Sequence, residues 1–473
     1  MSKPEKTPAQ QVPEGKTVSL YAKHTKIYAK SVQGKVFDNL RVVAAILTQL
    51  VFYGLCWLPW NDRQAVLFHL VERKFYIFGL VFWPQDVIYL AILLIISAYG
   101  LFLVTALAGR VFCGYACPQT VYTEVYMWIE RWVEGDRAKQ IKLDKLPKSN
   151  MERLRKRSIK YFLWAVVALW TGFTFVGYFT PMRELTHNVA TWTLGSWETF
   201  WIFFYAAFLF LMAGFMREQV CKYMCPYARF QSVMFDPDTL IVSYDEARGE
   251  PRALRRKGED NKGKGDCIDC GICVQVCPTG IDIRKGLQYE CIGCAACVDG
   301  CDEVMDKIGL PRGLVRYSTE NAMAGRSEHG GIVGHLIRTR VVIYTAILIV
   351  IVAATAWTLA HRMPLKVDVI RDRSIMSREA DDGRIENLYS LRVMNTDEHP
   401  HTYTFTVSGL NGIGIPGVTR IEVPPADARV LSMAVRADLD PSKTGSNTIF
   451  FDIAAVDNPE IQRHEKAIFI VPR

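Results

Sequence analysis

Cysteine is absent from the last third of this 473-residue chain, because none of its 13 cysteines lies after Cys301. A small protein stapled by disulfides spreads its cysteines along the whole chain, so this distribution argues against a disulfide scaffold. An apolar run is also missing from the first 40 residues, and we therefore expect no cleavable signal peptide. The modest net charge of +8 comes with no nucleic-acid-binding motif, so nucleic acid is not an expected partner.

Apolar residues make up 50% of the chain and aromatic residues 12%, which is high for a purely soluble protein. Five apolar segments are long enough to cross a hydrocarbon core of roughly 30 Å as helices. They span residues 41–60, 84–107, 160–180, 197–216 and 340–360. The sequence therefore predicts a multi-span α-helical membrane protein. A shorter stretch at 75–84, FYIFGLVFWP, is expected at the membrane interface.

The distribution of Lys and Arg predicts the orientation of these helices. The segment 108–160 holds 12 Lys and Arg residues, whereas 181–196 holds only Arg183. Basic loops stay in the cytoplasm, so the first segment is expected there, and the remaining parts follow by alternation. They are a cytoplasmic arm (1–40), a four-span domain (41–235), a cytoplasmic region (236–338), a fifth span (339–361) and an extracytoplasmic domain (364–473).

Residues 364–473 alternate apolar and polar side chains between clusters of Pro, Gly, Asn and Asp. Segments such as LKVDVI, HTYTFTVSG and KAIFIVPR have the two-residue period of a strand. About seven such strands in a domain of about 110 residues are typical of an all-β immunoglobulin-like sandwich. A jelly roll or another β sandwich is the alternative.

Eight cysteines form two motifs with the spacing C-x2-C-x2-C-x3-C. The motifs are GDCIDCGICVQVCPTG at 265–280 and YECIGCAACVDGCDEV at 289–304. This spacing is typical of bacterial-type ferredoxins with two [4Fe–4S] clusters, in which the fourth cysteine of each motif binds the other cluster. We therefore assign Cys267, Cys270, Cys273 and Cys301 to one cluster, and Cys291, Cys294, Cys297 and Cys277 to the other.

This ferredoxin domain is expected at 262–305, with Gly271, Gly280 and Gly293 in tight turns around the clusters. The alternative is a pair of zinc sites, but zinc sites use pairs of C-x-x-C rather than triplets. Two adjacent clusters favour electron relay over a purely structural role.

Two further cysteine pairs, in FCGYACP and VCKYMCP, follow the second and fourth predicted spans. Proline disfavours helical backbone in the residue before it, so Cys117 and Cys225 are expected at helix breaks. Pro118 and Pro226 then open the next helices. Helix N-termini and nearby basic residues favour thiolates, so we expect these thiols to ionise readily.

The two CxxxCP units place four soft sulfurs beside the ferredoxin domain. The residues concerned are Cys113, Cys117, Cys221 and Cys225. They could bind Cu(I), cycle between dithiols and a disulfide, or hold another cluster. The alternative is that they are small buried apolar side chains at helix ends.

The segment QTVYTEVYMWIERWVEG at 119–135 has the pattern of an amphipathic helix lying in the interface plane. Its expected apolar face holds Val121, Val125, Trp128, Ile129 and Trp132, and its polar face holds Thr120, Thr123, Glu124, Glu130 and Glu134. Gly135 is expected to end the helix.

The other candidate residues are isolated in the sequence. Cys56, near the end of the first span, is expected to pack in a core. The histidines His24, His69 and His187 are expected to be solvated in loops. His399 and His401, in EHPHTY, could bind a metal, but a turn between strands is the favoured interpretation.

Several stretches resemble one protein family. They are WLPWNDRQAVLF, FWPQD, GRVFCGYACPQT, IERWVEGDRAK, VGYFTP, GLQYECIGC and PRGLVRY. Together they resemble the cytochrome c oxidase accessory protein family known as CcoG, FixG or RdxA, and the resemblance covers most of the chain. Membrane ferredoxins of the NapH type share the CxxxCP units but lack the C-terminal domain.

The resemblance implies reduction of Cu(II) to Cu(I) for the assembly of a cbb3-type oxidase in the bacterial cytoplasmic (inner) membrane. Cys113, Cys117, Cys221 and Cys225 are then the expected catalytic and copper-binding residues. The implied partners are membrane lipid, oxidase assembly factors, a copper transporter and copper chaperones. Quinol-linked electron transfer of the NapH type and a non-enzymatic assembly scaffold are the alternatives. The electron donor and the oligomeric state, with a homodimer among the options, stay open.

Overall fold

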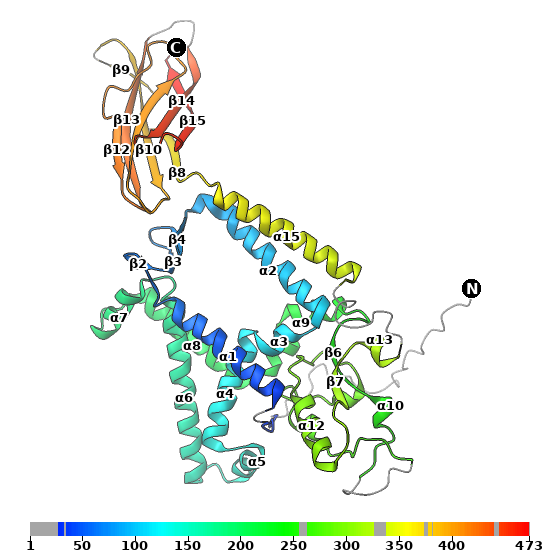
Figure 1. Ribbon diagram of the computed structural model, residues 1–473. Helices are drawn as coiled ribbons and strands as arrows, with labels where there is room; N and C mark the ends of the chain where they lie inside the picture. The colour runs from blue at the N-terminus through cyan, green and yellow to red at the C-terminus, as the bar shows by residue number, and fades with distance from the viewer. Residues whose placement is uncertain are drawn as a thin grey trace, which may run out of the picture.

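The computed structural model describes residues 27–32, 35–254, 263–325, 337–372, 377–380, 382–438 and 444–472. Most of the expected N-terminal arm, including His24, lies outside these residues. Figure 1 shows long helices in the middle of the molecule, with a β sandwich at one end and the cysteine-rich region at the other.

Five helices in the described residues are long and apolar enough to cross a membrane. They are α1 (Val36–Leu55), α2 (Val87–Ala108, preceded by η1, Pro84–Asp86), α6 (Met151–Val176), α8 (Ser196–Leu211, continued by η2, Met212–Met216) and α15 (Thr339–Ala360). Many of their large apolar side chains are exposed, as is usual for helices that face lipid. The prediction of a multi-span membrane protein is confirmed.

Two of these helices begin earlier than the sequence predicts, for different reasons. The start of α1 is capped from a distance, because Asp299 accepts hydrogen bonds from the backbone N–H groups of Phe37 (3.3 Å) and Asp38 (2.8 Å). The start of α6 is capped locally by the Asn150 side chain, which accepts two backbone hydrogen bonds from the first turn. The first predicted span also runs too far, since Pro59 lies beyond α1 in a short strand.

Short elements connect the long helices. They are α3 (Val111–Tyr115), α4 (Pro118–Glu134), α5 (Arg137–Lys145), α7 (Met182–Ala190), η3 (Val220–Met224) and α9 (Pro226–Met234). The cysteine-rich region contains β6 (Ile241–Tyr244), α10 (Glu246–Gly249), α11 (Ile272–Gln275), η4 (Ile283–Lys285), α12 (Ala296–Ile308), β7 (Val315–Ser318) and α13 (Glu320–Met323). Strands β6 and β7 pair antiparallel, so the chain enters and leaves this region at the same place.

Helix α4 ends where the sequence predicts, but the face that it buries is only partly the expected one. Val121 of the expected apolar face is buried, and so is Glu134 of the expected polar face. Tyr126 and Glu130 are buried, whereas Trp132 of the expected apolar face is 79% exposed. Tyr126 stacks on Trp164 of α6 with ring centroids 5.0 Å apart, and Glu130 forms an ion pair with Lys160 of the same helix. Helix α4 therefore packs against α6, and this contact, rather than its own amphipathic pattern, decides which face is covered.

The stretch expected at the membrane interface folds as a small antiparallel sheet. Its strands are β3 (Val66–His69), β4 (Lys74–Ile77) and β5 (Leu80–Phe82), and a two-stranded ribbon, β1 (Pro59–Trp60) and β2 (Arg63–Gln64), precedes them. Leu67, Tyr76 and Val81 share one buried cluster with Met394 of the sandwich. The apolar character of this stretch therefore serves to support the C-terminal domain.

The C-terminal domain is the immunoglobulin-like sandwich that the strand pattern predicts. One sheet has the order β13–β10–β8 with β9 beside β10, and the other has the order β12–β11–β14–β15. The strands are β8 (Leu365–Arg371), β9 (Arg378–Glu379), β10 (Ile385–Asn395), β11 (His401–Ser408), β12 (Arg420–Val423), β13 (Ala428–Ala437), β14 (Gly445–Ala455) and β15 (Gln462–Val471). Residues from both sheets, among them Tyr389, Phe405 and Phe451, form its core without any cysteine.

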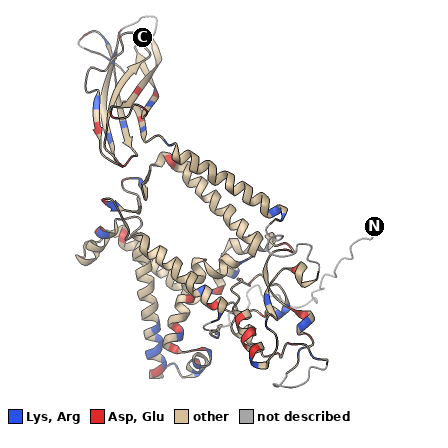
Figure 2. Cartoon of the chain, viewed as in Figure 1, with Lys and Arg blue, Asp and Glu red and all other residues tan. Residues whose placement is uncertain are grey.

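Charged side chains gather toward the two ends of the molecule, away from the middle of the long helices. Lys and Arg crowd α5 and the first turns of α6, and both signs occur in the cysteine-rich region, as Figure 2 shows. Helices α2 and α15, which pack side by side, carry almost no charge between their ends. The basic end of α6 and the cysteine-rich region thus lie away from the sandwich, at the opposite end of the helices.

Candidate functional site

The two cysteine motifs form similar sharp turns. In the first motif, Asp269 (φ 52°) and Gly271 (φ 66°) flank the second cysteine in left-handed conformation. Gly293 (φ 66°) and Ala295 (φ 55°) do the same in the second motif, and Gly280 has a φ of 71°. Left-handed backbone is rare outside glycine. Its recurrence on both sides of the second cysteine therefore indicates a loop that curves around a bound group.

The structure brings three cysteines of the first predicted set into one core, whereas the fourth, Cys270, is exposed. Cys267, Cys273 and Cys301 are buried in one core. Burial raises the pKa of the Cys301 thiol to about 12, and the nearby charges of Cys273, Cys270 and Cys267 act in the same direction. Cys301, the last cysteine of the second motif, therefore lies among the first three cysteines of the first motif.

The second predicted set lines one cavity. Cys277, Cys291, Cys294 and Cys297 all contribute to its wall, together with Cys273. Burial raises the pKa of Cys291 to about 12, with the thiols of Cys294 and Cys277 adding to the shift. The last cysteine of the first motif thus lies with the second motif, which is the crossed arrangement of two-cluster ferredoxins.

This donor set fits two [4Fe–4S] clusters. Within the described ranges, no three Cys, His, Asp or Glu side chains approach closely enough to hold a single metal ion. A zinc site draws its four ligands onto one ion, whereas a cubane keeps its thiolates apart at the corners of an inorganic core. It is the C-x2-C-x2-C-x3-C spacing of the two motifs that suits clusters rather than zinc.

Both CxxxCP units break the helix at their second cysteine, as the prolines predict. Cys117 has φ −62° and ψ 127°, and Cys225 has φ −77° and ψ 111°, so both are extended. Pro118 then opens α4 and Pro226 opens α9. The first cysteines of the two units lie one short turn earlier, in α3 and η3.

An irregular backbone ahead of the second unit is a feature that the sequence pattern does not reveal. Helix α8 changes to π-helical winding in η2, and Arg217 follows with a φ of 37°. Gln119, two residues after Cys117, donates hydrogen bonds to the carbonyl oxygens of Met212 (3.0 Å) and Arg217 (3.2 Å). These two hydrogen bonds fix the backbone ahead of the second CxxxCP unit to the first unit. π-helical turns often occur at functional sites.

The four CxxxCP thiols lie close enough to influence one another. Burial raises the pKa of Cys113 to about 12, and the thiols of Cys117, Cys221 and Cys225 contribute to the shift. Burial also raises the pKa of Cys221 to about 11. The expectation that these thiols ionise readily is therefore wrong for Cys113 and Cys221. Burial outweighs the cation of Arg110, whose guanidinium donates to backbone carbonyl oxygens instead.

The first CxxxCP unit touches the second ferredoxin motif directly. A Cβ on Gly114 would lie 2.9 Å from the carbonyl oxygen of Ile292 and 3.0 Å from the backbone of Cys294. Cys113 itself packs against the buried cluster that contains Ile292 and Cys294. Arg110 strengthens this contact, because its guanidinium donates to the carbonyl oxygens of Tyr289 and Ala228. Cys113 of the first CxxxCP unit and the expected cluster ligand Cys294 therefore lie close together, where Gly114 contacts the backbone of Cys294.

The remaining sequence candidates have local roles. Cys56 is 1% exposed in an apolar core, as predicted. The expectation that His69 and His187 lie in loops is wrong, because His69 ends β3 and His187 lies in α7, where it is exposed. His69 accepts a hydrogen bond from a backbone N–H. His401 begins β11 and is bonded to Asp397 and Asp457. Burial disfavours its charged form, but the two carboxylates outweigh this effect and raise its pKa. The prediction of a turn between strands is confirmed.

Three family models match the chain. A model described as a 4Fe-4S dicluster domain covers residues 216–320, and one described as a 4Fe-4S binding domain covers 90–135. A third, described as an IG-like fold at the C-terminal of FixG, covers 355–472. The match at 90–135 contains only two cysteines, Cys113 and Cys117.

The chain is also similar to whole proteins. Protein RdxB of Cereibacter sphaeroides is 42% identical over 84% of this chain and 84% of its own length. Nitrogen fixation protein FixG of Rhizobium meliloti is 36% identical over 83% of this chain and 80% of its own. A crystal structure of a FixG-related protein from Vibrio parahaemolyticus is 31% identical with a TM-score of 0.21, covering 23% of this chain and 95% of that one. With its iron–sulfur motifs, membrane helices and C-terminal sandwich, the chain belongs to the FixG/RdxA family of iron–sulfur electron-transfer proteins.

Proposed function

We propose that this membrane protein reduces Cu(II) to Cu(I) at its CxxxCP cysteines, with electrons from its ferredoxin region. The reduced copper serves the assembly of a cbb3-type oxidase and passes to a copper transporter and copper chaperones, as the family resemblance implies. Copper is the substrate in this proposal. The site consists of Cys113, Cys117, Cys221 and Cys225.

One observation carries the proposal, namely the contact between the first CxxxCP unit and the second ferredoxin motif. Gly114 meets the backbone of Ile292 and Cys294, with no side chain between them. When bound, the [4Fe–4S] clusters supply single electrons, and Cu(II) needs one electron to become Cu(I). A short path through packed backbone therefore joins the expected electron source to four thiols of the kind that prefer cuprous ion.

The chain's own residues have separable roles in this step. Cys113 and Cys221 are half-buried, and burial raises the pKa of both thiols, which favours the protonated form before a metal binds. Copper binding then displaces these protons, since the thiolate is the ligand. Gln119 holds the backbone ahead of Cys221 in place, and Arg110 holds the ferredoxin loop against α3.

A second use of the same cysteines is supported by one finding. The family model for a 4Fe-4S binding domain covers Cys113 and Cys117, so a further cluster is the competing occupant of the site. A dithiol cycle is the third use, and a non-enzymatic scaffold needs none of these thiols. The experiment that follows separates these functions.

The test converts Cys113, Cys117, Cys221 and Cys225 to Ser in the full-length protein. Serine has nearly the same size but a hard hydroxyl, so Cu(I) affinity and cupric reduction should each fall by at least about tenfold. Iron content and cluster absorption should equal those of the parent. Cys56→Ser is the control, because Cys56 is a cysteine at the end of α1 that lies outside the site and is even more deeply buried.

Parent-like copper binding and reduction in the fourfold variant would place the copper site elsewhere. Loss of iron together with copper would show that these cysteines hold or support a cluster, and the copper assignment would be withdrawn. Parent-like cupric reduction by a variant without the sandwich would count against the scaffold.

A further inference from the structure

A cavity of about 590 Å³ lies beside the contact between α4 and α6, and no step of the proposed function uses it. Its size falls within the usual range of small-molecule sites, roughly 300–1,000 Å³. The aromatic side chains of Tyr161, Trp164 and Phe215 contribute to its wall, from α6 and η2. Tyr161 and Phe215 are stacked, with ring centroids 6.0 Å apart. Planar, polarisable walls of this kind suit an aromatic ligand.

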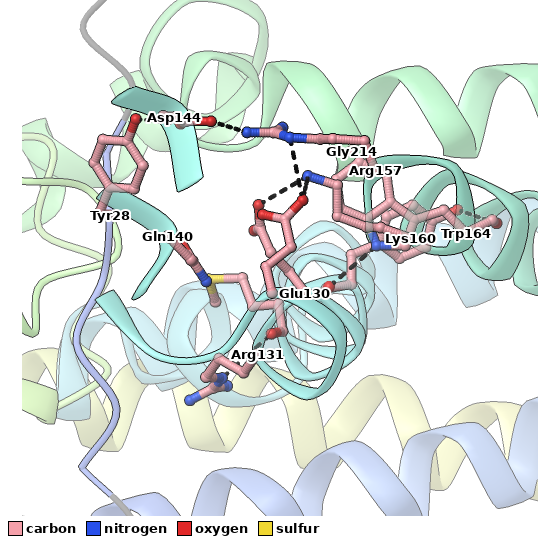
Figure 3. A network of polar contacts seen from close by, with 12 residues as sticks. Tyr28, Glu130, Arg131, Gln140, Asp144, Arg157, Lys160, Trp164 and Gly214 are labelled. Atoms are coloured by element: carbon pink, nitrogen blue, oxygen red, sulfur yellow. Dashed lines mark hydrogen bonds and ion pairs between the residues drawn. The ribbon is translucent and has the colours of Figure 1, made fainter. Parts of the chain in front are cut away.

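Most charged side chains at the inner wall of the cavity belong to one ion-pair network, part of which is shown in Figure 3. Lys148, Arg153 and Glu218 line the cavity outside this network. The members of the network are Arg157, Lys160 and Arg217 with Glu130, Glu134 and Asp144. Three cations face three carboxylates, so the network is neutral as a whole. Buried charges that already neutralise one another offer little to an anion, but their oxygens and nitrogens can hydrogen-bond a neutral polar group.

Apolar side chains at the cavity face outward. Leu154 is 55% exposed and Phe215 is 49% exposed, and both line the cavity. Phe215 belongs to a helical segment long and apolar enough to cross a membrane, where exposed apolar side chains meet lipid. Leu154 lies in the basic first turns of α6, before the apolar part of that helix. A ligand in this cavity can therefore keep an apolar tail in the bilayer, while Lys148 and Arg153 line the side that adjoins the basic loop.

A second cavity, nearer the cysteines, shares two charged lining residues with this one. Arg217 and Glu218 line both cavities, and the wall of the second includes Cys221 and Cys294. Glu218 precedes Cys221 by a single helical turn, and it is 8% exposed. The ligand position is thus joined to both the CxxxCP site and an expected cluster ligand through two side chains.

We propose that this cavity binds a membrane quinol and that the quinol is the electron donor of the protein. A quinol is a neutral aromatic diol with an apolar tail, which matches the aromatic wall, the neutral polar network and the lipid-facing side chains. The destination of its electrons rests on the proposed function. The binding site itself rests only on the cavity.

Oxidation of one quinol to a quinone breaks two O–H bonds and yields two electrons and two protons. With two [4Fe–4S] clusters bound by the ferredoxin cysteines, this region would take up the two electrons one at a time and could pass each to one Cu(II). The carboxylate of Glu218, which lines the cavity, accepts the protons in turn and releases them toward the aqueous side, where Lys148 is exposed.

The test blocks the cavity with Leu154→Trp in the full-length protein. Binding of decylubiquinone and of a short-chain menaquinone analogue is measured directly by equilibrium dialysis. Reduction of the clusters by the corresponding quinols, and by dithionite, is followed from their absorption. The added ring should weaken quinone binding and slow reduction by quinol at least about tenfold, which corresponds to ~1.4 kcal/mol. Reduction by dithionite should stay unchanged.

Phe162→Trp is the matched control, because Phe162 is an exposed residue of α6 that does not line the cavity. It should behave like the parent. Glu218→Gln should keep quinone binding but slow reduction by quinol, since the amide cannot accept a proton. Equal quinone binding by the parent and by Leu154→Trp would overturn the proposal. So would loss of a copurified anionic phospholipid, rather than of quinone, from Leu154→Trp.

Failure of the proposed function gives a different result. In that case dithionite-reduced protein does not reduce Cu(II), while quinone binding and its loss in Leu154→Trp persist.

Discussion

At the residue scale, Lys160 shows how charge is kept inside a membrane helix. It is 1% exposed, and its ammonium lies 3.2 Å from Glu130 and 2.7 Å from Glu134. The rings of Tyr161 and Trp164 lie 5.0 Å from the same ammonium and add cation–π attraction. Sliding α4 along α6 would leave carboxylates buried without a cation, so the network selects one register of the two helices.

Lys160→Met should destabilise the protein by about 3–5 kcal/mol, because it removes a cation from two buried carboxylates. Thermal unfolding of the purified protein in detergent measures the change. Lys156→Met is the control, since Lys156 pairs with the exposed Glu152 at 2.7 Å. Its loss should cost less than about 1 kcal/mol. Equal unfolding temperatures for the two variants would show that the buried network does not stabilise the helix pair.

At the scale of elements, the short helix α3 is the piece that joins membrane and ferredoxin region. Gly114 lies in its middle, and the missing side chain allows α3 to approach the backbone of Cys294. Arg110, at the start of α3, ties the same loop down through its guanidinium. Close approach of two backbones is one of the few positions where glycine has no substitute.

Gly114→Ala should separate the two units, since its Cβ would lie 2.9 Å from the carbonyl oxygen of Ile292. We expect a loss of about 1–3 kcal/mol in stability from overpacking. Transfer of electrons from reduced clusters to Cu(II), followed by stopped-flow absorption, should slow while iron content stays that of the parent. Gly100→Ala in α2 is the control, because nothing lies within 4 Å of its added Cβ. Unchanged transfer in Gly114→Ala would remove this contact from the electron path.

At the scale of the whole molecule, the sandwich is tied to the membrane part at several points. Arg63 pairs with Glu398 at 2.9 Å, and Lys74 pairs with Asp427 at 2.9 Å. Asp86, at the start of α2, pairs with Lys366 of β8 and also with Arg362, just after α15. These contacts hold the sandwich at the end of α2 and α15 that lies away from the cysteine-rich region.

The arrangement predicts opposite sides of the membrane for the two ends. A reporter fused after Arg473 should register as extracytoplasmic, and one inserted within 240–265 as cytoplasmic. The reason is that the basic segment 108–160 lies at the same end of the molecule as the cysteine-rich region. Paired fusions to a periplasmic and a cytoplasmic reporter measure this, each serving as the control for the other. Signals on the same side, or reversed, would overturn the five-span topology.

Much of the fold could be predicted from sequence because it depends on neighbours along the chain. Apolar runs are long enough to span a membrane whatever they pack against, and period-two strands must pair in a sandwich. Pro118 and Pro226 break the helix by steric conflict with the residue before them. The left-handed turn at Gly271 follows equally from local backbone freedom.

What the chain pattern could not reveal depends on residues far apart in sequence. The amphipathic pattern of α4 points to a face with Trp132, but Lys160 and Trp164 cover Glu130 and Tyr126 instead. Helix N-termini and basic neighbours suggest reactive thiols, yet burial raises the pKa of Cys113. Burial and long-range ion pairs arise only when distant segments pack together, and their energies exceed the local preferences from which sequence predictions are made.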